Sequence, residues 1–207
     1  MPEEKKIVEK KYYDFISVAK RTTQNVYFVA QHDKNKMFEL LLKSSDKKQT
    51  VVLCKSKKNA DSLAEFLKAK DIKAIAIHGN HRVEQINDAR LSFNVKQINI
   101  LITTEMILKS MELTNIERII SYDLPLVAQD YFPRLKLVDE IGEAICFVSS
   151  DEEVMLESIE ILMRCEMKEL ELEGFSPTPA PKKEKKNKKP RHSKKRVTKE
   201  DKSLDDN

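Results

Sequence analysis

Short apolar runs alternate along this chain with longer stretches in which apolar residues recur at helical spacing. The short runs predict six β-strands, and helices are predicted between these strands and after the last one. Because strand and helix alternate throughout, the pattern is typical of an α/β fold with a mainly parallel sheet. The strands are expected at residues 26–30, 51–54, 74–78, 98–103, 118–121 and 144–148.

Two of the predicted helices carry apolar stripes. Their members recur every three or four residues, so each stripe lies on one side of its helix. Such stripes face a protein core far more often than they contact a cofactor, and we expect a core face in both helices. The residues are Leu63, Phe66 and Leu67 in the second helix and Leu156, Ile159, Leu162 and Met163 in the last.

Motif-like residues follow several of the predicted strands. His78 opens a His-Gly turn and is followed fifteen residues later by Phe93. The run ILITTEMILKSMEL closes one strand and opens a short helix, and Tyr122-Asp123-Leu124-Pro125 forms the exit of another strand. With this spacing the chain resembles the second RecA-type domain of a DEAD-box RNA helicase. The flanking segments NVYFVAQHDKNKMFELLL, VVLCKSKKNADSLAEFL and SDEEVMLESIEILMRCEMKELELEGFSPTP are similar to the bacterial RhlE-type branch.

The resemblance covers residues 13–179 and implies a domain organisation. It implies a RecA-like three-layer sandwich with a mainly parallel sheet of six strands. The domain is expected over residues 23–175, after an N-terminal extension at 1–22 and before a tail at 176–207.

Most of the groups that support ATP hydrolysis in this family are missing. After a tyrosine that matches Tyr131, the family has a histidine-arginine pair and two further arginines, and these places hold Pro133, Arg134, Leu137 and Glu140. Such arginines contribute roughly 4 to 7 kcal/mol to phosphoryl transfer. The sequence also lacks a G-x-x-x-x-G-K-[ST] loop and a D-E-A-D run. We expect no catalytic residue, no metal site and no cofactor, with ATP bound only if a separate ATPase half complements the chain.

Two positions remain from the nucleotide site of the family. Arg134 matches the first of the three arginines, and Glu112 stands where an acid of the family reaches the nucleotide ribose. Lys109 and Ser110 replace the arginine and glycine that precede this acid in the family. The resemblance therefore predicts Glu112 and Arg134 as residual nucleotide-site positions.

The turns that contact RNA in the family are better kept. Gly79 matches a glycine whose main chain meets the RNA backbone, and Asn80 and Arg82 follow it. A backbone without Cβ lets a phosphate approach closely, although a simple turn requirement explains a glycine equally well. Thr104 matches a threonine that contacts an RNA phosphate, and a role as helix N-cap explains it with even odds. We expect Gly79, Asn80, Arg82 and Thr104 to bind RNA.

Charge separates the tail from the rest of the chain. Residues 176–207 hold twelve Lys or Arg against five Asp or Glu, a surplus of seven, so a total of +4 leaves −3 for residues 1–175. The tail is proline-led and nearly free of large apolar groups, which predicts disorder. Its positive charge favours sequence-independent contacts with phosphates, whereas a purely solubilising role is the alternative. The expected RNA-binding residues there are Lys182, Lys183, Lys185, Lys186, Lys188, Lys189, Arg191, Lys194, Lys195 and Arg196.

The cysteines and the hydropathy of the chain lead to two separate expectations. Cys54, Cys146 and Cys165 are too far apart for a zinc knuckle or a redox pair, and their apolar neighbours predict small buried thiols. No apolar run approaches the roughly 18 residues that a membrane span requires, and the N-terminus is charged. We expect a soluble, cytoplasmic protein.

Three functions are compatible with these residues. The first is a non-catalytic, degenerate helicase C-terminal-like domain that binds RNA or a ribonucleoprotein, mainly through its tail. The second is a helicase half that works in trans with a separate ATPase domain in ATP-dependent RNA unwinding. The third is a protein-interaction scaffold derived from a helicase, with Phe132, Leu135 and Leu137 forming an apolar surface patch.

Overall fold

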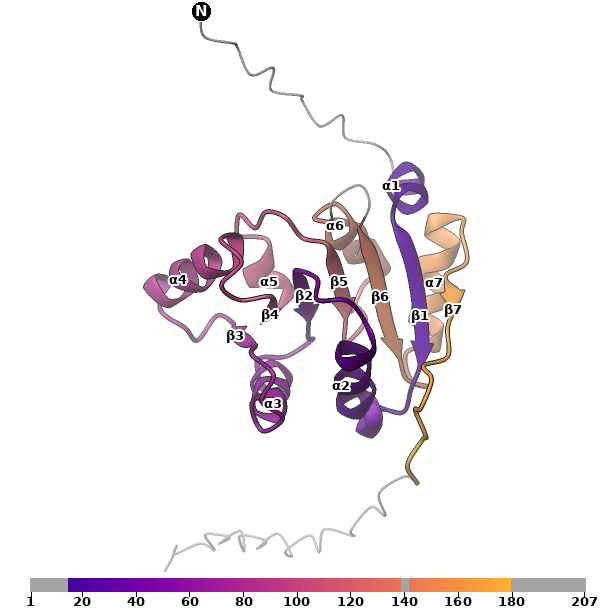
Figure 1. Cartoon of the computed structure of the whole chain (residues 1–207). Coiled ribbons are helices and arrows are strands. Elements are labelled where there is room, and N and C mark those ends of the chain that lie inside the picture. Colours follow the sequence, from indigo (N-terminus) through magenta and orange to yellow (C-terminus); the bar gives the residue numbers. More distant parts are fainter. Residues whose placement is uncertain (1–14, 139–141, 180–207) are drawn as a thin grey trace, which may run out of the picture.

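A parallel β-sheet forms the middle layer of the molecule in the computed structural model, which describes residues 15–138 and 142–179. Within these residues seven strands lie in the order β3-β4-β2-β5-β6-β1-β7, and every neighbouring pair is parallel (Figure 1). The strands are β1 (Thr23–Phe28), β2 (Thr50–Leu53), β3 (Ile75–Ile77), β4 (Ile100–Thr103), β5 (Arg118–Ser121), β6 (Glu143–Val148) and β7 (Lys168–Glu169).

Helices cover both faces of the sheet and complete a three-layer arrangement. On one face lie α2 (Lys34–Ser44) and α3 (Lys57–Lys68). The short 3-10 turns η1 (Gln31–Asp33) and η2 (Ala128–Asp130) precede α2 and α6. The helices of the opposite face are α1 (Phe15–Arg21), α4 (Val83–Asn94), α5 (Glu105–Leu108), α6 (Tyr131–Leu135) and α7 (Glu153–Met163).

The central strand β2 shows why two cores form. Val51 and Leu53 belong to the hydrophobic cluster under α1 and α4 to α7, whereas Val52 belongs to the cluster under α2 and α3. Successive side chains of a strand point to opposite faces, and none of these three is exposed. A continuous apolar run is therefore what a strand covered on both faces requires.

The expected α/β fold with a mainly parallel sheet is confirmed. All six predicted strands form, and their first residues lie within three positions of the predicted ones. The seventh strand, β7, was not predicted, because its two residues are exposed and charged and carry no apolar pattern.

The apolar stripes of the two helices are mostly buried as predicted. Leu63 and Leu67 are buried in α3, as are Leu156, Ile159 and Met163 in α7. The prediction for Leu162 was wrong, since 38% of its surface is exposed. Adjacent helical residues point about 100° apart, so Leu162 lies beyond the edge of the stripe that Met163 continues.

The expected N-terminal extension contributes a helix to the core. Ala19 of α1 is buried, and its carbonyl accepts a hydrogen bond from Gln24 Nε2 at 2.9 Å. Helix α1 also contacts α6 and α7. Its residues therefore pack with the domain that was expected to begin at residue 23.

A C-terminal strap, residues 170–179, follows β7 along the sheet edge. Leu170 N–H donates to the carbonyl of Val26 (2.9 Å), and Phe175 packs against the core on the α2 side. The backbone N–H and the hydroxyl of Thr178 donate to the carboxylate of Asp33 at 2.8 and 2.6 Å. Contacts thus extend past residue 175, where the domain was expected to end, and residues 1–14, 139–141 and 180–207 lie outside the described residues.

Two of the three cysteines are buried as predicted. Cys54 and Cys146 lie in the core, but Cys165 is exposed, which corrects that prediction. Cys165 follows Arg164, whose left-handed backbone (φ 53°) ends α7 and turns the chain outward. In the described part of the chain, no helix has the length and apolar character of a membrane span.

Candidate nucleic-acid interface

A cleft of about 440 Å³ opens where β2, β4 and β5 end. We call it the strand-end cleft. Parallel sheets place ligand-binding loops at this edge, because the exits of neighbouring strands lie side by side there. Its lining residues come from the three strand exits and from α6: Cys54, Lys55, Ser56, Lys57, Thr104, Glu105, Met106, Leu124, Pro125, Leu126, Asp130 and Arg134.

The exit of β2 brings two lysines to this cleft. The Ser56 side chain accepts the backbone N–H of Asn59 at 3.1 Å and caps α3, so the helix begins directly after the strand. Lys55 and Lys57 flank this cap, and Lys57 Nζ donates to Asn80 Oδ1 at 2.6 Å. Neither lysine was predicted as a site residue, although two cations around a capping serine after a buried strand were a usable signal.

Asp123 links the strand exits beneath the cleft. Its carboxylate is fully buried, and Oδ2 accepts the Lys55 backbone N–H (2.9 Å) and Asn59 Nδ2 (3.0 Å). The ammonium groups of Lys34 and Lys55 lie 3.8 and 3.9 Å from Oδ1. The exits of β5 and β2 are therefore held together by charge-assisted contacts.

The turn after β3 lies against the β2 exit. His78 is buried and its Nε2 lies 2.8 Å from Asp61 Oδ1, which fixes the start of the turn. Gly79 does not have a positive φ, and a Cβ there would lie 3.5 Å from Lys57 Nζ, an ordinary contact distance. The fold itself therefore does not require glycine at this position, so the simple turn explanation is wrong.

The two other predicted residues of this turn differ in placement. Asn80 is joined to the strand-end cleft through Lys57. Arg82 is exposed, and its backbone N–H donates to Gln85 Oε1 at 2.9 Å at the start of α4. Arg82 is not among the residues that line the cleft.

Thr104 stands at the exit of β4, at the N-cap position of α5. Its backbone carbonyl accepts the N–H groups of Ile107 (3.1 Å) and Leu108 (3.0 Å). The side chain makes no capping hydrogen bond. Capping by the hydroxyl therefore does not account for Thr104, and this residue lines the cleft.

Arg134 lines the same cleft but is turned inward. Its side chain is 4% exposed, and Nε donates to Glu105 Oε2 at 2.8 Å. Nη1 donates to Ser121 Oγ (2.8 Å) and to the carbonyl of Asp123 (3.1 Å). The guanidinium joins α6 to the exits of β4 and β5, and its assignment to a residual nucleotide site stays a prediction.

Glu112 lies away from the cleft. Its side chain is 93% exposed, and Oε2 is 3.8 Å from Arg90 Nη1 of α4. Its backbone carbonyl accepts Asn94 Nδ2 at 3.1 Å. The structure thus does not bring Glu112 together with Arg134, and its predicted contact with a nucleotide remains untested.

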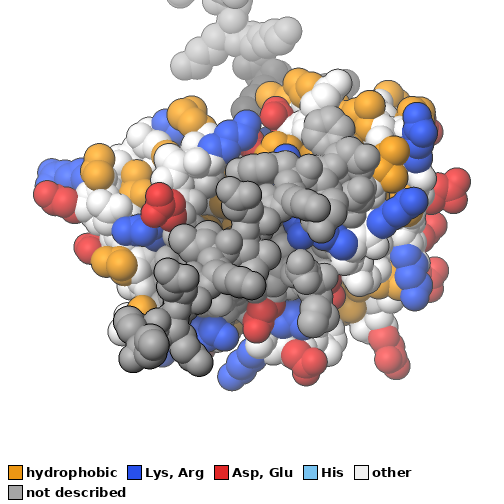
Figure 2. Space-filling model, turned by 90° about the horizontal axis from the view of Figure 1, so that it is seen from above, with side chains coloured by type: hydrophobic (Ala, Val, Ile, Leu, Met, Phe, Trp, Pro, Cys, Tyr) orange, Lys and Arg blue, Asp and Glu red, His pale blue; other side chains and the backbone are white. Residues whose placement is uncertain are grey.

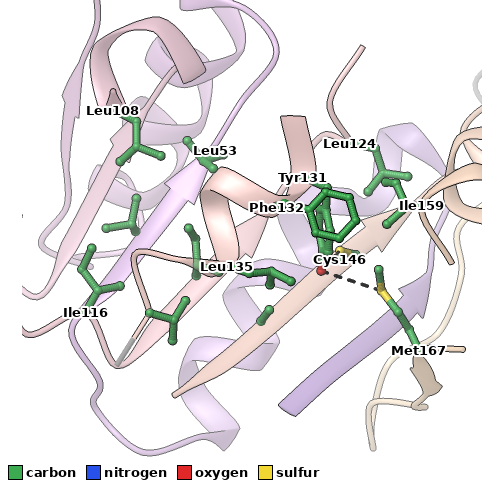
Figure 3. Packing of buried hydrophobic residues seen from close by; sticks show 14 of the residues in the cluster. Leu53, Leu108, Ile116, Leu124, Tyr131, Phe132, Leu135, Cys146, Ile159 and Met167 are labelled. Carbon is green, nitrogen blue, oxygen red and sulfur yellow. Dashed lines mark hydrogen bonds between the residues drawn. The ribbon is translucent and has the colours of Figure 1, made fainter. Parts of the chain in front are cut away.

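The residues expected to form an apolar surface patch are part of the core. Phe132 and Leu135 are fully buried and point into the cluster between α6 and the sheet (Figure 3). Leu137 packs against the same cluster. The prediction of an apolar surface patch is therefore wrong, because the short helix α6 turns its apolar side inward. Glu140 lies outside the described residues.

Cys54 gives the cleft no reactive thiol. Burial raises its pKa, and the negative charge of Asp123 raises it further. The thiol therefore stays protonated and is a poor nucleophile or metal ligand. No group of three or more potential metal ligands occurs in residues 15–138 and 142–179.

The expected RNA-binding residues of the tail lie outside the described residues, so their role stays a prediction. They are Lys182, Lys183, Lys185, Lys186, Lys188, Lys189, Arg191, Lys194, Lys195 and Arg196.

Comparison with known proteins decides the family. The model of the helicase conserved C-terminal domain matches residues 33–135, about half of the chain. The DEAD-box ATP-dependent RNA helicase RhpA of Helicobacter pylori is 26% identical over 121 residues, which is 58% of this chain and 25% of that protein. Residues 33–135 form a helicase C-terminal domain of the DEAD-box type. The chain spans about a quarter of the length of the curated relatives it matches.

Solved structures of DEAD-box proteins are similar in fold to this helicase C-terminal domain. A DEAD box protein from Methanococcus jannaschii is 27% identical, with a TM-score of 0.69 over 74% of this chain and 43% of that one. Escherichia coli SrmB, solved with the regulator of ribonuclease activity A, is 19% identical, with a TM-score of 0.71 over 77% of this chain and 97% of that one. At such identity SrmB is similar in fold alone. The narrower RhlE-type branch stays a prediction.

Proposed function

We propose that this helicase C-terminal domain binds the phosphate backbone of RNA, free or within a ribonucleoprotein, and does not itself catalyse ATP hydrolysis. The strand-end cleft supplies one contact surface, and the Lys/Arg-rich tail supplies a second, sequence-independent one. The single observation that carries the proposal is the joint placement of Lys55, Lys57 and Thr104 around one cleft beside Gly79.

The chemistry of these groups suits a phosphate backbone. Lys55 and Lys57 provide ammonium donors, and the hydroxyl of Thr104 is not used in capping. Gly79 has no side chain to shield its backbone from a phosphate, although the fold would accommodate a Cβ there. Phosphate contacts of this kind fix the position of a nucleic acid without reading its sequence.

The proposed lack of catalysis rests on the charges around the cleft. Arg134 is engaged with Glu105 and with two acceptors of β5 and its exit. Leu137, which replaces an arginine of the family, packs against the core and carries no charge. Arg134 is the one arginine among the described residues that line the cleft, and its engagement supports the proposal that no guanidinium there neutralises a transferring phosphate.

The test compares RNA binding by two double variants of the full chain. Lys55→Ala/Lys57→Ala is expected to weaken the binding of a single-stranded RNA about tenfold, because two charge-assisted contacts are lost. Lys20→Ala/Lys68→Ala removes the same charge from exposed positions outside the cleft and is expected to change the affinity less than twofold. Equal losses in both variants would show that the cleft is not an RNA site.

A second candidate function is docking of a separate helicase ATPase domain. Three apolar side chains beside the strand-end cleft are exposed: Met106 (72%), Leu126 (83%) and Val127 (51%). Exposed apolar groups beside a ligand site are typical of a protein interface. Mixing the chain with an ATPase half of a DEAD-box helicase is expected to raise RNA-stimulated ATP turnover, and unchanged turnover would contradict this function.

A further inference from the structure

A second cavity lies at the amino-terminal ends of the strands, opposite the strand-end cleft. Its volume is about 450 Å³, and its lining includes Thr50, Ile100 and Arg118, the first residues of β2, β4 and β5. We call it the strand-start pocket. Figure 2 looks toward this edge, where Lys and Arg side chains are interspersed with Asp and Glu in the described part of the surface. The two cavities share no lining residue.

Cations outnumber acids in the lining of the strand-start pocket. They come from the end of α2, the following loop, the loop before β3 and the start of β5. Their excess indicates a preference for anions. The cations are Lys43, Lys47, Lys48, Lys73 and Arg118, and the acids are Asp46 and Asp71.

Part of this charge forms a fixed wall. Arg118 is 3% exposed, its Nε donates to Glu143, and its Nη1 donates to Ser45 Oγ at 3.0 Å. Lys48 Nζ lies 3.2 Å from the same carboxylate. Burial raises the pKa of Glu143, but Arg118 and Lys48 lower it below the ordinary value, so the acid stays ionised. Two cations share one carboxylate, which leaves this wall with a net positive charge.

Two further lysines are uncommitted. Within residues 15–138 and 142–179, Lys47 and Lys73 make no ion pair or hydrogen bond with another described group. They belong to different loops, one before β2 and one before β3. An anion between them would gain two charge-assisted contacts without breaking an existing pair.

The rest of the lining suits an organic part rather than a bare ion. Leu42 and Ile72 are half-buried and Ile100 is buried, so the pocket has an apolar floor. Asp46 and Asp71 also line the pocket, and their carboxylates can accept hydrogen bonds from hydroxyl groups. Apolar floor, hydroxyl acceptors and cations together match the three parts of a nucleotide.

We propose that the strand-start pocket binds a nucleoside monophosphate. Its phosphate lies between Lys47 and Lys73, its sugar hydroxyls donate to Asp46 or Asp71, and its base lies on the apolar floor. The volume falls in the range of small-molecule pockets. This site is separate from the proposed RNA cleft and would be occupied whether or not RNA is bound.

The experiment titrates AMP into the full chain by isothermal calorimetry, with adenosine and inorganic phosphate as partial ligands. AMP is expected to bind with one-to-one stoichiometry, and each partial ligand at least about tenfold more weakly. Lys47→Ala/Lys73→Ala is expected to weaken AMP about tenfold or more, because both phosphate contacts are lost. Lys20→Ala/Lys68→Ala carries the same charge change and is expected to leave AMP binding unchanged.

The RNA variants separate this proposal from the proposed function. Lys55→Ala/Lys57→Ala is expected to keep AMP affinity while it loses RNA affinity. No saturable AMP binding, equal binding of AMP and adenosine, or loss of AMP through the cleft variant alone would each overturn the nucleotide site. A negative result with AMP leaves the RNA measurement independent, since different lysines carry the two ligands.

Discussion

Gly79 combines an ordinary backbone conformation with an open approach to its Cα. Its φ is not positive, and a Cβ would lie 3.5 and 3.6 Å from Lys57 Nζ and Cε, the far end of a flexible side chain. The fold should therefore accept a methyl group at this position. The same methyl group should block a phosphate that approaches the main chain, because it would occupy the place of the phosphate.

Gly79→Ala is therefore expected to separate stability from binding. The free energy of unfolding should stay equal or rise by about 0.4 to 1 kcal/mol, because alanine restricts the unfolded chain. RNA affinity should fall severalfold. Urea unfolding and RNA titration measure the two quantities. Gly174→Ala is the matched control, since its φ of 78° makes alanine cost about 1 kcal/mol while RNA affinity should not change. Unchanged RNA affinity in Gly79→Ala would contradict the proposed contact.

Arg134 is expected to stabilise the fold strongly. Arg134→Ala leaves Glu105 without its buried partner and should lower the free energy of unfolding by about 3 kcal/mol. Lys109→Ala removes the exposed pair between Lys109 Nζ and Asp130 Oδ1 (3.4 Å) and should cost less than about 0.5 kcal/mol. Urea unfolding of both variants measures this. Equal small effects would instead indicate an arginine that is free to meet a ligand.

Single residues of the cleft were predictable only where a motif was kept. Gly79 and Thr104 follow β3 and β4 closely, in a recognisable pattern, whereas their contact with RNA stays a prediction. The inward orientation of the Arg134 side chain was not predictable, because it depends on Glu105 and Ser121 from two other segments. Long-range partners of this kind leave no local signal in the sequence.

At the scale of elements, the C-terminal strap depends on one ionised acid. Burial raises the pKa of Asp33, but the two hydrogen bonds from Thr178 and the nearby charges of His32 and Lys36 lower it below the ordinary value. The folded pKa is thus depressed, so this contribution to stability is full above the unfolded pKa of about 3.9. It is lost as the pH falls through the lower folded value.

Asp33→Asn is expected to reduce the dependence of stability on acid. At pH 7 the variant should be less stable than the natural chain, because an amide accepts the Thr178 hydrogen bonds with one oxygen and no charge. The difference should shrink between about pH 4 and pH 2, as Asp33 becomes protonated in the natural chain. Thermal unfolding across this range measures it. A difference that stays constant down to pH 2 would contradict the role of ionised Asp33.

Elements were predictable where burial imposes a period on the sequence. The six apolar strands and the stripes of α3 and α7 have this property. The strand β7 and the strap do not, because they are held by a backbone bond from Leu170 and by the contacts of Thr178. Helix α1 packs through Ala19, a small residue with little hydrophobic signal.

At the scale of the whole molecule, charge is divided between two parts. Residues 176–179 are uncharged, so the chain up to Pro179 keeps the charge of −3 and residues 180–207 carry +7. A weakly acidic body gains little from long-range attraction to RNA, whereas the tail gains much. The cleft should therefore provide a positional contact and the tail most of the affinity at low salt.

Removal of residues 180–207 is expected to flatten the salt dependence of RNA binding. The truncation ends after Pro179, because Thr178 still holds the strap on Asp33. Each phosphate neutralised on a single strand contributes a slope of about −0.7 to log K against log salt. The ten Lys and Arg of residues 182–196 should make the slope of the full chain steeper by several units. RNA titrations at salt concentrations between about 50 and 200 mM measure this slope. Identical slopes for the two chains would show that the tail neutralises no phosphate, and the cleft alone would then have to account for any binding that remains.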